Sequence, residues 1–210
     1  MQNSSLLDLT RLITTGMPVY PGDTPPQLTE TVHFEESACV NYQIKSSMHV
    51  GTHIDGPMHM VKEGRRLCDL ELDRFFGRGV LVDARGKTLL DADLLDGLSL
   101  QKGDVVLFWT DWDKKFGTEA YFAEFPVLSE ALAERLIELE VKMIGLDNPS
   151  PDRAPYPVHR LLLGKEILII ENLCGLEALQ GRVDFEVIAL PTKYYADSAP
   201  ARVVARSVVS

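Results

Sequence analysis

Three of the five histidines lie with an aspartate in one short segment, residues 48–60, which reads MHVGTHIDGPMHM. The four side chains of interest there are His49, His53, Asp55 and His59. On an extended strand all four would point to one side, but at a rise of about 3.3 Å per residue His49 and His53 would stand about 13 Å apart. Metal–ligand bonds are only about 2.0–2.2 Å long, so one ion cannot be reached from both ends of that span. The segment must bend if its side chains act together.

The segment also contains residues that favour a bend over a helix. On a helix, His49 and His53 would share a face while Asp55 would fall well round the cylinder. Two glycines and a proline, Gly51, Gly56 and Pro57, are poor helix residues but allow sharp turns and close approach of the backbone to an ion. Crowding several titratable groups without a cation would cost desolvation free energy and force pKa shifts. We therefore predict a bent strand or loop around a metal.

No ligand role is predicted for His33, which lies in the polar segment 31–36.

The segment resembles the HxGTHxDxPxH signature of the cyclase-like metal-dependent hydrolases, a family that includes bacterial kynurenine formamidases and isatin hydrolases. The similarity extends to residues 8–10 and 17–23 near the start of the chain and to residues 197–202 near its end. The resemblance implies a swivelling β/β/α domain with a mixed central β-sheet, and a homodimer or homotetramer.

The resemblance also implies metal ligands from the second half of the chain, His159 and Glu171. Glu171 directly follows the β-branched run 166–170, which predicts a buried strand, and α/β proteins tend to place ligand sites at the carboxyl ends of such strands. Without the resemblance, an exposed glutamate at a strand end is the alternative. By resemblance, His49, His53 and Asp55 hold one metal, and His159 and Glu171 complete a second site that Asp55 bridges. A single-metal site remains open. Imidazole and carboxylate ligands without thiolate suit Zn²⁺ or Mn²⁺.

By the same resemblance, His59 is a general acid/base rather than a ligand. A histidine that titrates near pH 7 can take a proton from metal-activated water and deliver one to a leaving amine or alkoxide. The alternatives for His59 are a further metal ligand or a group that orients the ligands.

Composition sets wider bounds on the class of protein. A chain of 210 residues with 45% hydrophobic and 25% charged residues can bury the core of one domain, which we expect to span residues 1–210. A net charge of −10 and a pI near 4.9 argue against nucleic acid or an anionic membrane as partner. The amino-terminal residues 1–8 lack the features of a signal peptide, which predicts a cytoplasmic protein. We expect the three cysteines, Cys39, Cys68 and Cys174, to be buried small side chains without disulfides.

Hydrophobic periodicity predicts an α/β protein. Strands are expected at residues 40–46, 79–82, 104–109, 142–145, 167–171 and 185–190. The clearest helix is expected at residues 129–140, with Ser129 as its cap and a leucine-rich stripe that packs into the core.

Two further segments are candidates for the substrate pocket. Trp109 and Trp112 follow a predicted strand and could stack on an aromatic substrate, with buried packing as the alternative. The turn-rich loop 146–152 resembles a conserved loop of the family, but Asn148 replaces the usual threonine and Pro149 follows it. This departure weakens transfer of one member's substrate to this chain.

Three functional hypotheses follow. The first is a metal-dependent hydrolase that cleaves a small amide, lactam or ester, with N-formylkynurenine as a candidate because arylformamidases share the motif. The second is a metal-dependent lyase or cyclase that stabilises an enolate with His59 as base. The third is a metal-dependent small-molecule binding protein without turnover.

Overall fold

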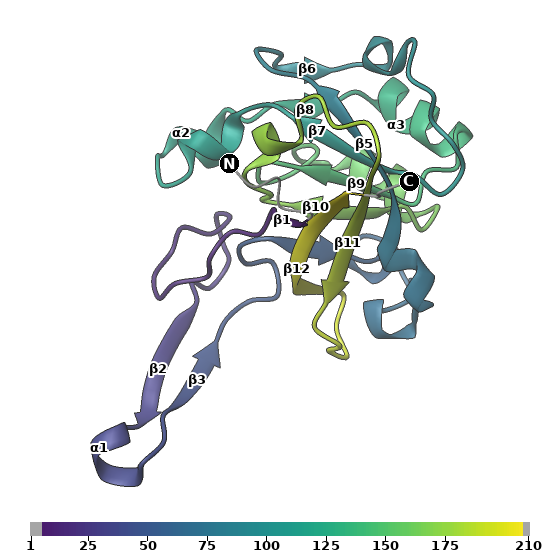
Figure 1. Cartoon of the computed structure of the whole chain (residues 1–210). Helices are drawn as coiled ribbons and strands as arrows, with labels where there is room; N and C mark the ends of the chain where they lie inside the picture. Colours follow the sequence, from purple (N-terminus) through teal and green to yellow (C-terminus); the bar gives the residue numbers. More distant parts are fainter. Residues whose placement is uncertain (1–5, 208–210) are drawn as a thin grey trace.

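The computed structural model describes residues 6–207 and contains a mixed β-sheet that closes on itself (Figure 1). In sheet order, the strands are β1 (Leu6–Asp8), β12 (Ser198–Ser207), β11 (Phe185–Pro191), β5 (Phe76–Asp83), β7 (Val105–Trp109), β9 (Met143–Leu146), β10 (Leu168–Glu171) and β4 (His53–Asp55). β4 also pairs with β12, so the sheet closes on itself like a barrel. Neighbours are parallel from β5 through β10 and antiparallel elsewhere, which confirms the predicted mixed sheet.

The other elements surround this sheet or project from it. The α-helices are α1 (Phe34–Ser37), α2 (Ala120–Ala123), α3 (Glu130–Glu138) and α4 (Pro157–Leu163). Two further strand pairs are β2 (Gln27–Val32) with β3 (Asn41–Lys45), and β6 (Leu89–Leu90) with β8 (Val127–Leu128). Short 3₁₀ turns are η1 (Pro57–His59), η2 (Leu67–Asp69), η3 (Leu72–Phe75), η4 (Ala92–Leu95), η5 (Trp112–Lys115) and η6 (Leu176–Leu179).

The period-two pattern of the strands divides the core into two layers. Along β7, Val105, Leu107 and Trp109 join the cluster inside the closed sheet, while Val106 and Phe108 pack on the other face with α3 and α4. Every residue of β7 is buried because both faces of this strand are covered.

The predicted strands and the long helix are confirmed. β5, β7, β9, β10 and β11 all overlap their expected ranges, and α3 begins after Ser129, whose Oγ accepts a hydrogen bond of 3.0 Å from Leu132 N. β12 was not predicted, although it is the longest strand in the part of the chain that the structure describes.

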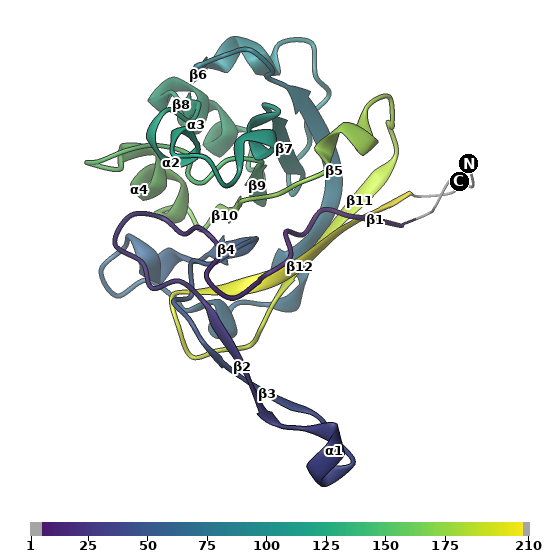
Figure 2. The ribbon, with the colours of Figure 1, turned by 90° about the vertical axis from the view of Figure 1, so that its left-hand side faces the viewer.

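The predicted strand at residues 40–46 is also confirmed, but β3 lies outside the central sheet. β2 and β3 form a hairpin that carries α1 at its end and extends away from the body in both views (Figures 1 and 2). All five residues of β3 are exposed. We call residues 27–45 the arm.

The expectation that the cysteines are buried is wrong. Cys39 is exposed on the arm, Cys68 and Cys174 are partly exposed, and all three thiols are free. Residues 1–5, on which much of the localisation prediction rests, lie outside the described residues. Within residues 6–207, no helix is long and apolar enough to cross a membrane.

Candidate metal centre

The centre is built on β4, which lies between β10 and β12. Glu171 is directly opposite His53, and Ser198 is directly opposite Asp55. Residues two apart on a strand share a face, so His53 and Asp55 point the same way as Glu171 on the neighbouring strand. The strand register therefore gathers ligand side chains from residues more than 100 positions apart.

Two glycines give the segment the bend that its sequence predicts. Gly51 has a φ of +57°, in the left-handed region that favours glycine, and it turns the chain between His49 and His53. A Cβ at Gly56 would lie 2.8 Å from the carbonyl oxygen of Asp197, while Gly56 N donates to that oxygen at 3.0 Å. Because Gly56 has no side chain, the segment before β12 can lie against the centre.

His159 reaches the centre from α4. Asp152 holds the start of this helix, because its Oδ2 accepts hydrogen bonds from Val158 N at 2.7 Å and His159 N at 3.2 Å. The other carboxylate oxygen, Oδ1, lies 2.5 Å from His159 Nδ1. Asp152 therefore fixes both the helix and the orientation of the imidazole.

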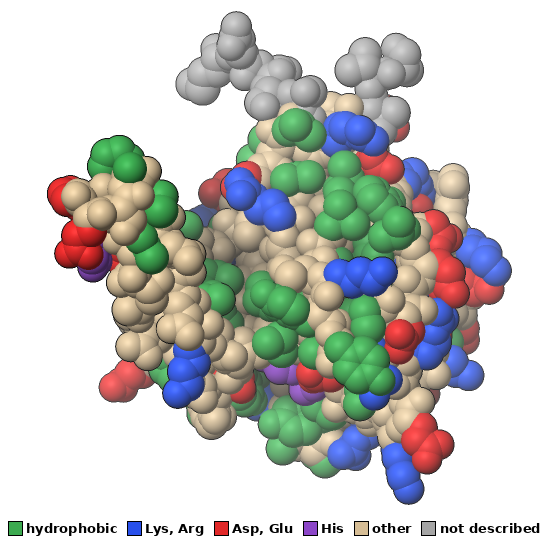
Figure 3. Space-filling view, turned by 90° about the horizontal axis from the view of Figure 1, so that it is seen from below, with side chains coloured by type: hydrophobic (Ala, Val, Ile, Leu, Met, Phe, Trp, Pro, Cys, Tyr) green, Lys and Arg blue, Asp and Glu red, His purple; other side chains and the backbone are tan. Residues whose placement is uncertain are grey.

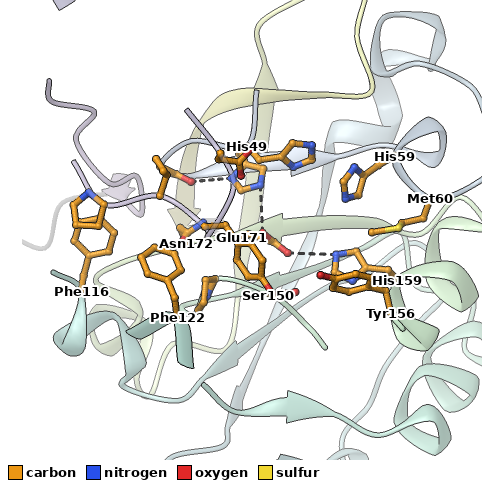
Figure 4. A pocket seen from close by; sticks show the side chains of 17 residues that line it. His49, His59, Met60, Phe116, Phe122, Ser150, Tyr156, His159, Glu171 and Asn172 are labelled. Atoms are coloured by element: carbon orange, nitrogen blue, oxygen red, sulfur yellow. Dashed lines mark hydrogen bonds and ion pairs between the residues drawn. The ribbon is translucent and has the colours of Figure 1, made fainter. Parts of the chain in front are cut away.

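The predicted ligand atoms converge around Asp55. Its Oδ1 lies 2.9 Å from His49 Nδ1 and 3.4 Å from His53 Nε2, and its Oδ2 lies 3.7 Å from His159 Nε2. Glu171 spans the same space, with Oε2 at 3.3 Å from His53 Nε2 and Oε1 at 3.5 Å from His159 Nε2 (Figure 4). The structure brings together all five residues that the sequence assigns to the metal.

The orientation of the two buried imidazoles fits a cation. His53 Nδ1 lies 2.9 Å from Gly51 O, which can only accept a hydrogen bond, so Nδ1 carries the proton and Nε2 faces the carboxylates. His53 Nε2 and both Asp55 oxygens are buried and make no well-aligned hydrogen bond, although Asp55 Oδ1 lies 2.9 Å from His49 Nδ1. Two ligand atoms bound at about 2.1 Å to a tetrahedral ion lie about 3.4 Å apart, which matches the separations of 3.3–3.7 Å around His53 and His159. The donor set and its spacing therefore fit a divalent metal.

In the metal-free protein, protons occupy the same imidazole nitrogens that would bind a metal. Burial alone would lower the pKa of His49, but the carboxylates of Asp55 and Asp197 outweigh it and raise that pKa to about 11. Burial alone would raise the pKa of Asp55, yet the neighbouring imidazoles hold it well below its usual range. Metal binding must displace these protons, so metal affinity falls as pH falls.

His59 lies beside the ligands, on η1. Its ring centroid is 4.2 Å from that of His49 and 5.8 Å from that of His159. Its Nδ1 lies 3.2 Å from Asp197 Oδ2, which also lies 3.0 Å from His49 Nε2. Asp197 belongs to the segment that resembles the family's closing residues, but its sequence context predicts no role for it; the pairing of β12 with β4 brings it to the site.

The centre opens into a cavity of about 170 Å³. Its aromatic lining comes from Tyr20, Phe116, Phe122 and Tyr156. Figure 4 shows Phe116 and Phe122 on one side of the cluster, with His59 and Met60 on the other. An engineered cavity of about 150 Å³ holds benzene, so this space accommodates one aromatic ring. The sequence did not single out these four residues, because they come from separate segments: Tyr20 and Phe116 from loops or turns, Phe122 from α2, and Tyr156 from the position before α4.

The two tryptophans do not line this cavity, which corrects their prediction as stacking residues. Trp109 is buried in the core under the guanidinium of Arg85, and the Trp112 indole donates to Tyr121 O at 3.0 Å. Asn148 has a packing role as well: its side chain donates to Pro126 O at 2.9 Å and accepts from Ser150 N at 3.2 Å. Asn148 therefore fastens the loop that carries Ser150 into the cavity.

Comparison with known proteins agrees with this site. The family model Cyclase, described as "Putative cyclase", matches residues 7–153. A kynurenine formamidase of Erythrobacter litoralis is 32% identical over 190 residues, which cover 89% of this chain and 86% of the relative. Isatin hydrolase A from Ralstonia solanacearum is 25% identical, with a TM-score of 0.86 over 95% of this chain and 90% of the other. A "predicted metal-dependent hydrolase" from Bacillus stearothermophilus is 30% identical, with a TM-score of 0.77 over 95% and 97%.

The fold, the cluster of imidazoles and carboxylates, and the aromatic cavity define a metal-dependent hydrolase. The chain belongs to the cyclase family.

Proposed function

We propose that the protein is an arylformamidase that converts N-formylkynurenine to kynurenine and formate. The observation that carries this proposal is the aromatic lining of the cavity: Phe116 and Phe122 lie on one side of the cluster, and His59 lines the same cavity on the other side. An aryl group in this cavity would bring an attached formamide to the ligands. The name of the Erythrobacter litoralis relative supports the same substrate.

The cluster residues His49, His53, Asp55, His159 and Glu171 would hold one or two Zn²⁺ ions, or Mn²⁺ in their place. A metal held there supplies Lewis-acid polarisation of a carbonyl and lowers the pKa of a water molecule. Gly51 O and Asp152 fix His53 and His159 with Nε2 toward the centre, so these ligands are oriented before the metal arrives.

His59 would move the proton in the reaction. Its Nδ1 is held by Asp197, so its Nε2 is the atom that takes a proton from the attacking water and gives it to the leaving nitrogen. The amide C–N bond breaks, the water oxygen bonds to the formyl carbon, and the amine leaves with the transferred proton. The aromatic side chains that line the cavity would exclude water from the space around the substrate.

Hydrolysis of N-formylkynurenine by purified protein tests this proposal. We expect turnover that a chelator abolishes, that Zn²⁺ or Mn²⁺ restores, and that His59→Ala lacks although it keeps its metal. No turnover by fully metallated protein would contradict the assignment of this substrate. Lactams such as isatin are the next substrates to test, because the Ralstonia solanacearum structure is that of an isatin hydrolase.

Two further measurements, hydrogen exchange and ligand affinity, separate the two alternative functions. A lyase or cyclase that acts through an enolate would exchange a substrate C–H for deuterium in D₂O without adding water to the product. A binding protein would retain ligand affinity and would catalyse no reaction, so His59→Ala would cause no loss of activity.

We also propose a cytoplasmic location. The three free cysteines support it, because free thiols suit a reducing compartment, and cell fractionation tests it.

A further inference from the structure

Asn172 directly follows Glu171, and both residues line the cavity. Neighbouring residues on a strand point to opposite faces, so a regular continuation of β10 would turn Asn172 away from the side that Glu171 faces. The strand ends at Glu171, and Asn172 has a φ of +58°, in the left-handed region that asparagine adopts more readily than most residues. This change in backbone direction lets two adjacent side chains reach the same cavity.

Most hydrogen-bonding groups of Asn172 are already paired. Its backbone N donates to Asn148 O at 3.0 Å, and its backbone O accepts from Thr52 Oγ1 at 2.7 Å. Its side-chain Oδ1 accepts from the Tyr121 hydroxyl at 2.8 Å. Within residues 6–207 the side-chain nitrogen Nδ2 has no hydrogen-bond partner, although Asn172 is only 7% exposed. Buried polar groups are normally paired, so this NH₂ group is the part of Asn172 that a ligand in the cavity would satisfy.

Tyr121 fixes which end of the amide remains for a ligand. Its side chain is fully buried, and burial raises the pKa of its hydroxyl far above the ordinary value, so the hydroxyl keeps its proton and needs an acceptor. Asn172 Oδ1 provides that acceptor. The reversed amide would leave the buried hydroxyl proton without one, which is unfavourable. Oδ1 therefore faces Tyr121, and Nδ2 is the free donor.

The position of Asn172 limits the ligand group that it can reach. In Figure 4 it lies on the same side of the cluster as Phe116 and Phe122, away from His59. On the face shown in Figure 3, histidine side chains are visible on the body among hydrophobic side chains, so a ligand can enter from this side. An amide NH₂ group is an uncharged donor, and a carbonyl oxygen is its matching acceptor.

The proposed substrate carries such a carbonyl. In N-formylkynurenine an acyl group is attached to the ring carbon next to the one that bears the formamide. With the formamide at the cluster and the ring beside Phe116 and Phe122, this ortho group projects from the ring on the side of the cluster, where Asn172 lies. A para substituent would point away from the cluster.

We propose that Asn172 Nδ2 donates a hydrogen bond to the oxygen of an acyl group ortho to the scissile formamide, which makes the protein selective for ortho-acyl aryl formamides. This role rests on the proposed arylformamidase function. Asn172 is then a specificity-determining residue, because it contacts the substrate away from the bond that breaks. Tyr121 is a positioning residue, because it acts through Asn172.

Three aryl formamides isolate this contact. The acyl group is ortho in 2′-formamidoacetophenone, para in 4′-formamidoacetophenone and absent from formanilide. The para compound is the matched control, because its acyl group also withdraws electrons from the leaving nitrogen but lies out of reach of Asn172. With metal-loaded wild type, kcat/KM for the ortho compound should exceed that for the para compound by at least about 10-fold.

Variants assign the preference to the amide. Asn172→Asp keeps the size of the side chain, but an ionised carboxylate cannot donate, so the ortho-to-para ratio of kcat/KM should fall by at least about 10-fold. Tyr121→Phe should lower the ratio by a smaller factor, because the amide can then rotate. The control Tyr42→Phe removes a hydroxyl that donates to Glu30 on the arm and should leave the ratio unchanged. Damage to the overall structure would lower all the rates together and would not change the ratio.

Binding of the amine products gives a measurement that needs no turnover. In calorimetry of the metal-loaded protein, 2′-aminoacetophenone should bind wild type at least about 10-fold more tightly than 4′-aminoacetophenone. Asn172→Asp should lose this preference.

The outcomes separate this inference from the proposed function. Hydrolysis of the formamides with an ortho-to-para ratio that Asn172→Asp leaves unchanged would overturn the role of Asn172 and leave the arylformamidase standing. If none of the three formamides is hydrolysed but the binding preference still depends on Asn172, the arylformamidase is contradicted and the hydrogen bond is supported. Absence of both hydrolysis and a binding preference would contradict both.

Discussion

Asp197 Oδ2 lies 3.2 Å from Nδ1 of His59, across 138 positions of sequence. A carboxylate can only accept, and the imidazoles of His49 and His59 hold the pKa of Asp197 far below its usual range, so Asp197 is ionised. Nδ1 of His59 therefore carries a proton, and Nε2 is left to exchange one with substrate. The pair resembles in its chemistry the carboxylate–imidazole pairs that orient general bases in other hydrolases.

Asp197→Asn should lower kcat by about 10–100-fold, because an amide can present its NH₂ to Nδ1 and favour the wrong tautomer. Metal content should stay at the wild-type value. Steady-state kinetics and atomic emission measure the two quantities.

A double-mutant cycle with His59→Ala shows which histidine transmits the effect of Asp197. Once His59 is removed, Asp197→Asn should cause little further loss if it acts through His59. Full additivity would instead assign its effect to His49, which lies 3.0 Å from the same oxygen.

His59→Ala and His53→Ala should fail in different ways. Removal of a general acid/base costs about 10²–10⁴ in rate, so His59→Ala should retain metal and lose turnover. His53 contributes a buried nitrogen between Asp55 and Glu171, so His53→Ala should lose metal first and activity as a consequence. Isothermal titration with Zn²⁺ and kcat, measured on both variants, test this difference. Loss of metal in His59→Ala would make His59 a ligand, the alternative left open by the sequence.

The sequence predicted the parts of this site that one local pattern contains. Residues 48–60 placed four functional side chains in one bend, and the β-branched run before Glu171 located a buried strand ending in a carboxylate. The pairing of β4 with both β10 and β12 has no local signal, so the position of Asp197 could not be predicted. The cavity wall was missed for the same reason: Phe116 and Phe122 are positioned by tertiary packing, while nearby Trp109 continues the alternation of β7 into the core.

Asp152→Asn should reduce both helix stability and metal affinity. Asp152 holds the first residues of α4 and orients His159, so its replacement should lower the free energy of unfolding by about 1–2 kcal/mol and weaken metal binding by about 10–100-fold. Urea denaturation of the metal-free protein and metal titration measure these effects separately.

Asp91→Asn is the matched control for Asp152→Asn. Asp91 accepts hydrogen bonds from Ala92 N and Ser129 Oγ at the starts of η4 and α3, away from the metal centre. The Asp91→Asn variant should have a lower free energy of unfolding and an unchanged metal affinity. Unchanged metal affinity in Asp152→Asn would show that the contact of Asp152 with His159 does not support the centre.

Asp147 should make stability depend on pH. Burial raises the pKa of its carboxyl to about 7, although hydrogen bonds from Thr110 and from Asp111 N oppose this shift. In the unfolded chain the pKa returns to about 3.9, so between pH 4 and 7 the folded state holds a proton that the unfolded state has released. Stability from this group is therefore present below pH 4 and is lost as pH rises to about 7, by about 1.4 kcal/mol per pH unit.

Asp147→Asn isolates this contribution, because asparagine keeps the size of the side chain and does not titrate. Other titrating groups are shared by the two metal-free proteins, so they cancel when the free energies of unfolding are subtracted at each pH. We expect that difference to shift in favour of the variant as pH rises from 5 to 7 and then to level off. Denaturation curves at pH 5, 6, 7 and 8 measure it. A difference that stays constant over this range would show that the donors of Thr110 and Asp111 keep Asp147 ionised at the lower pH values.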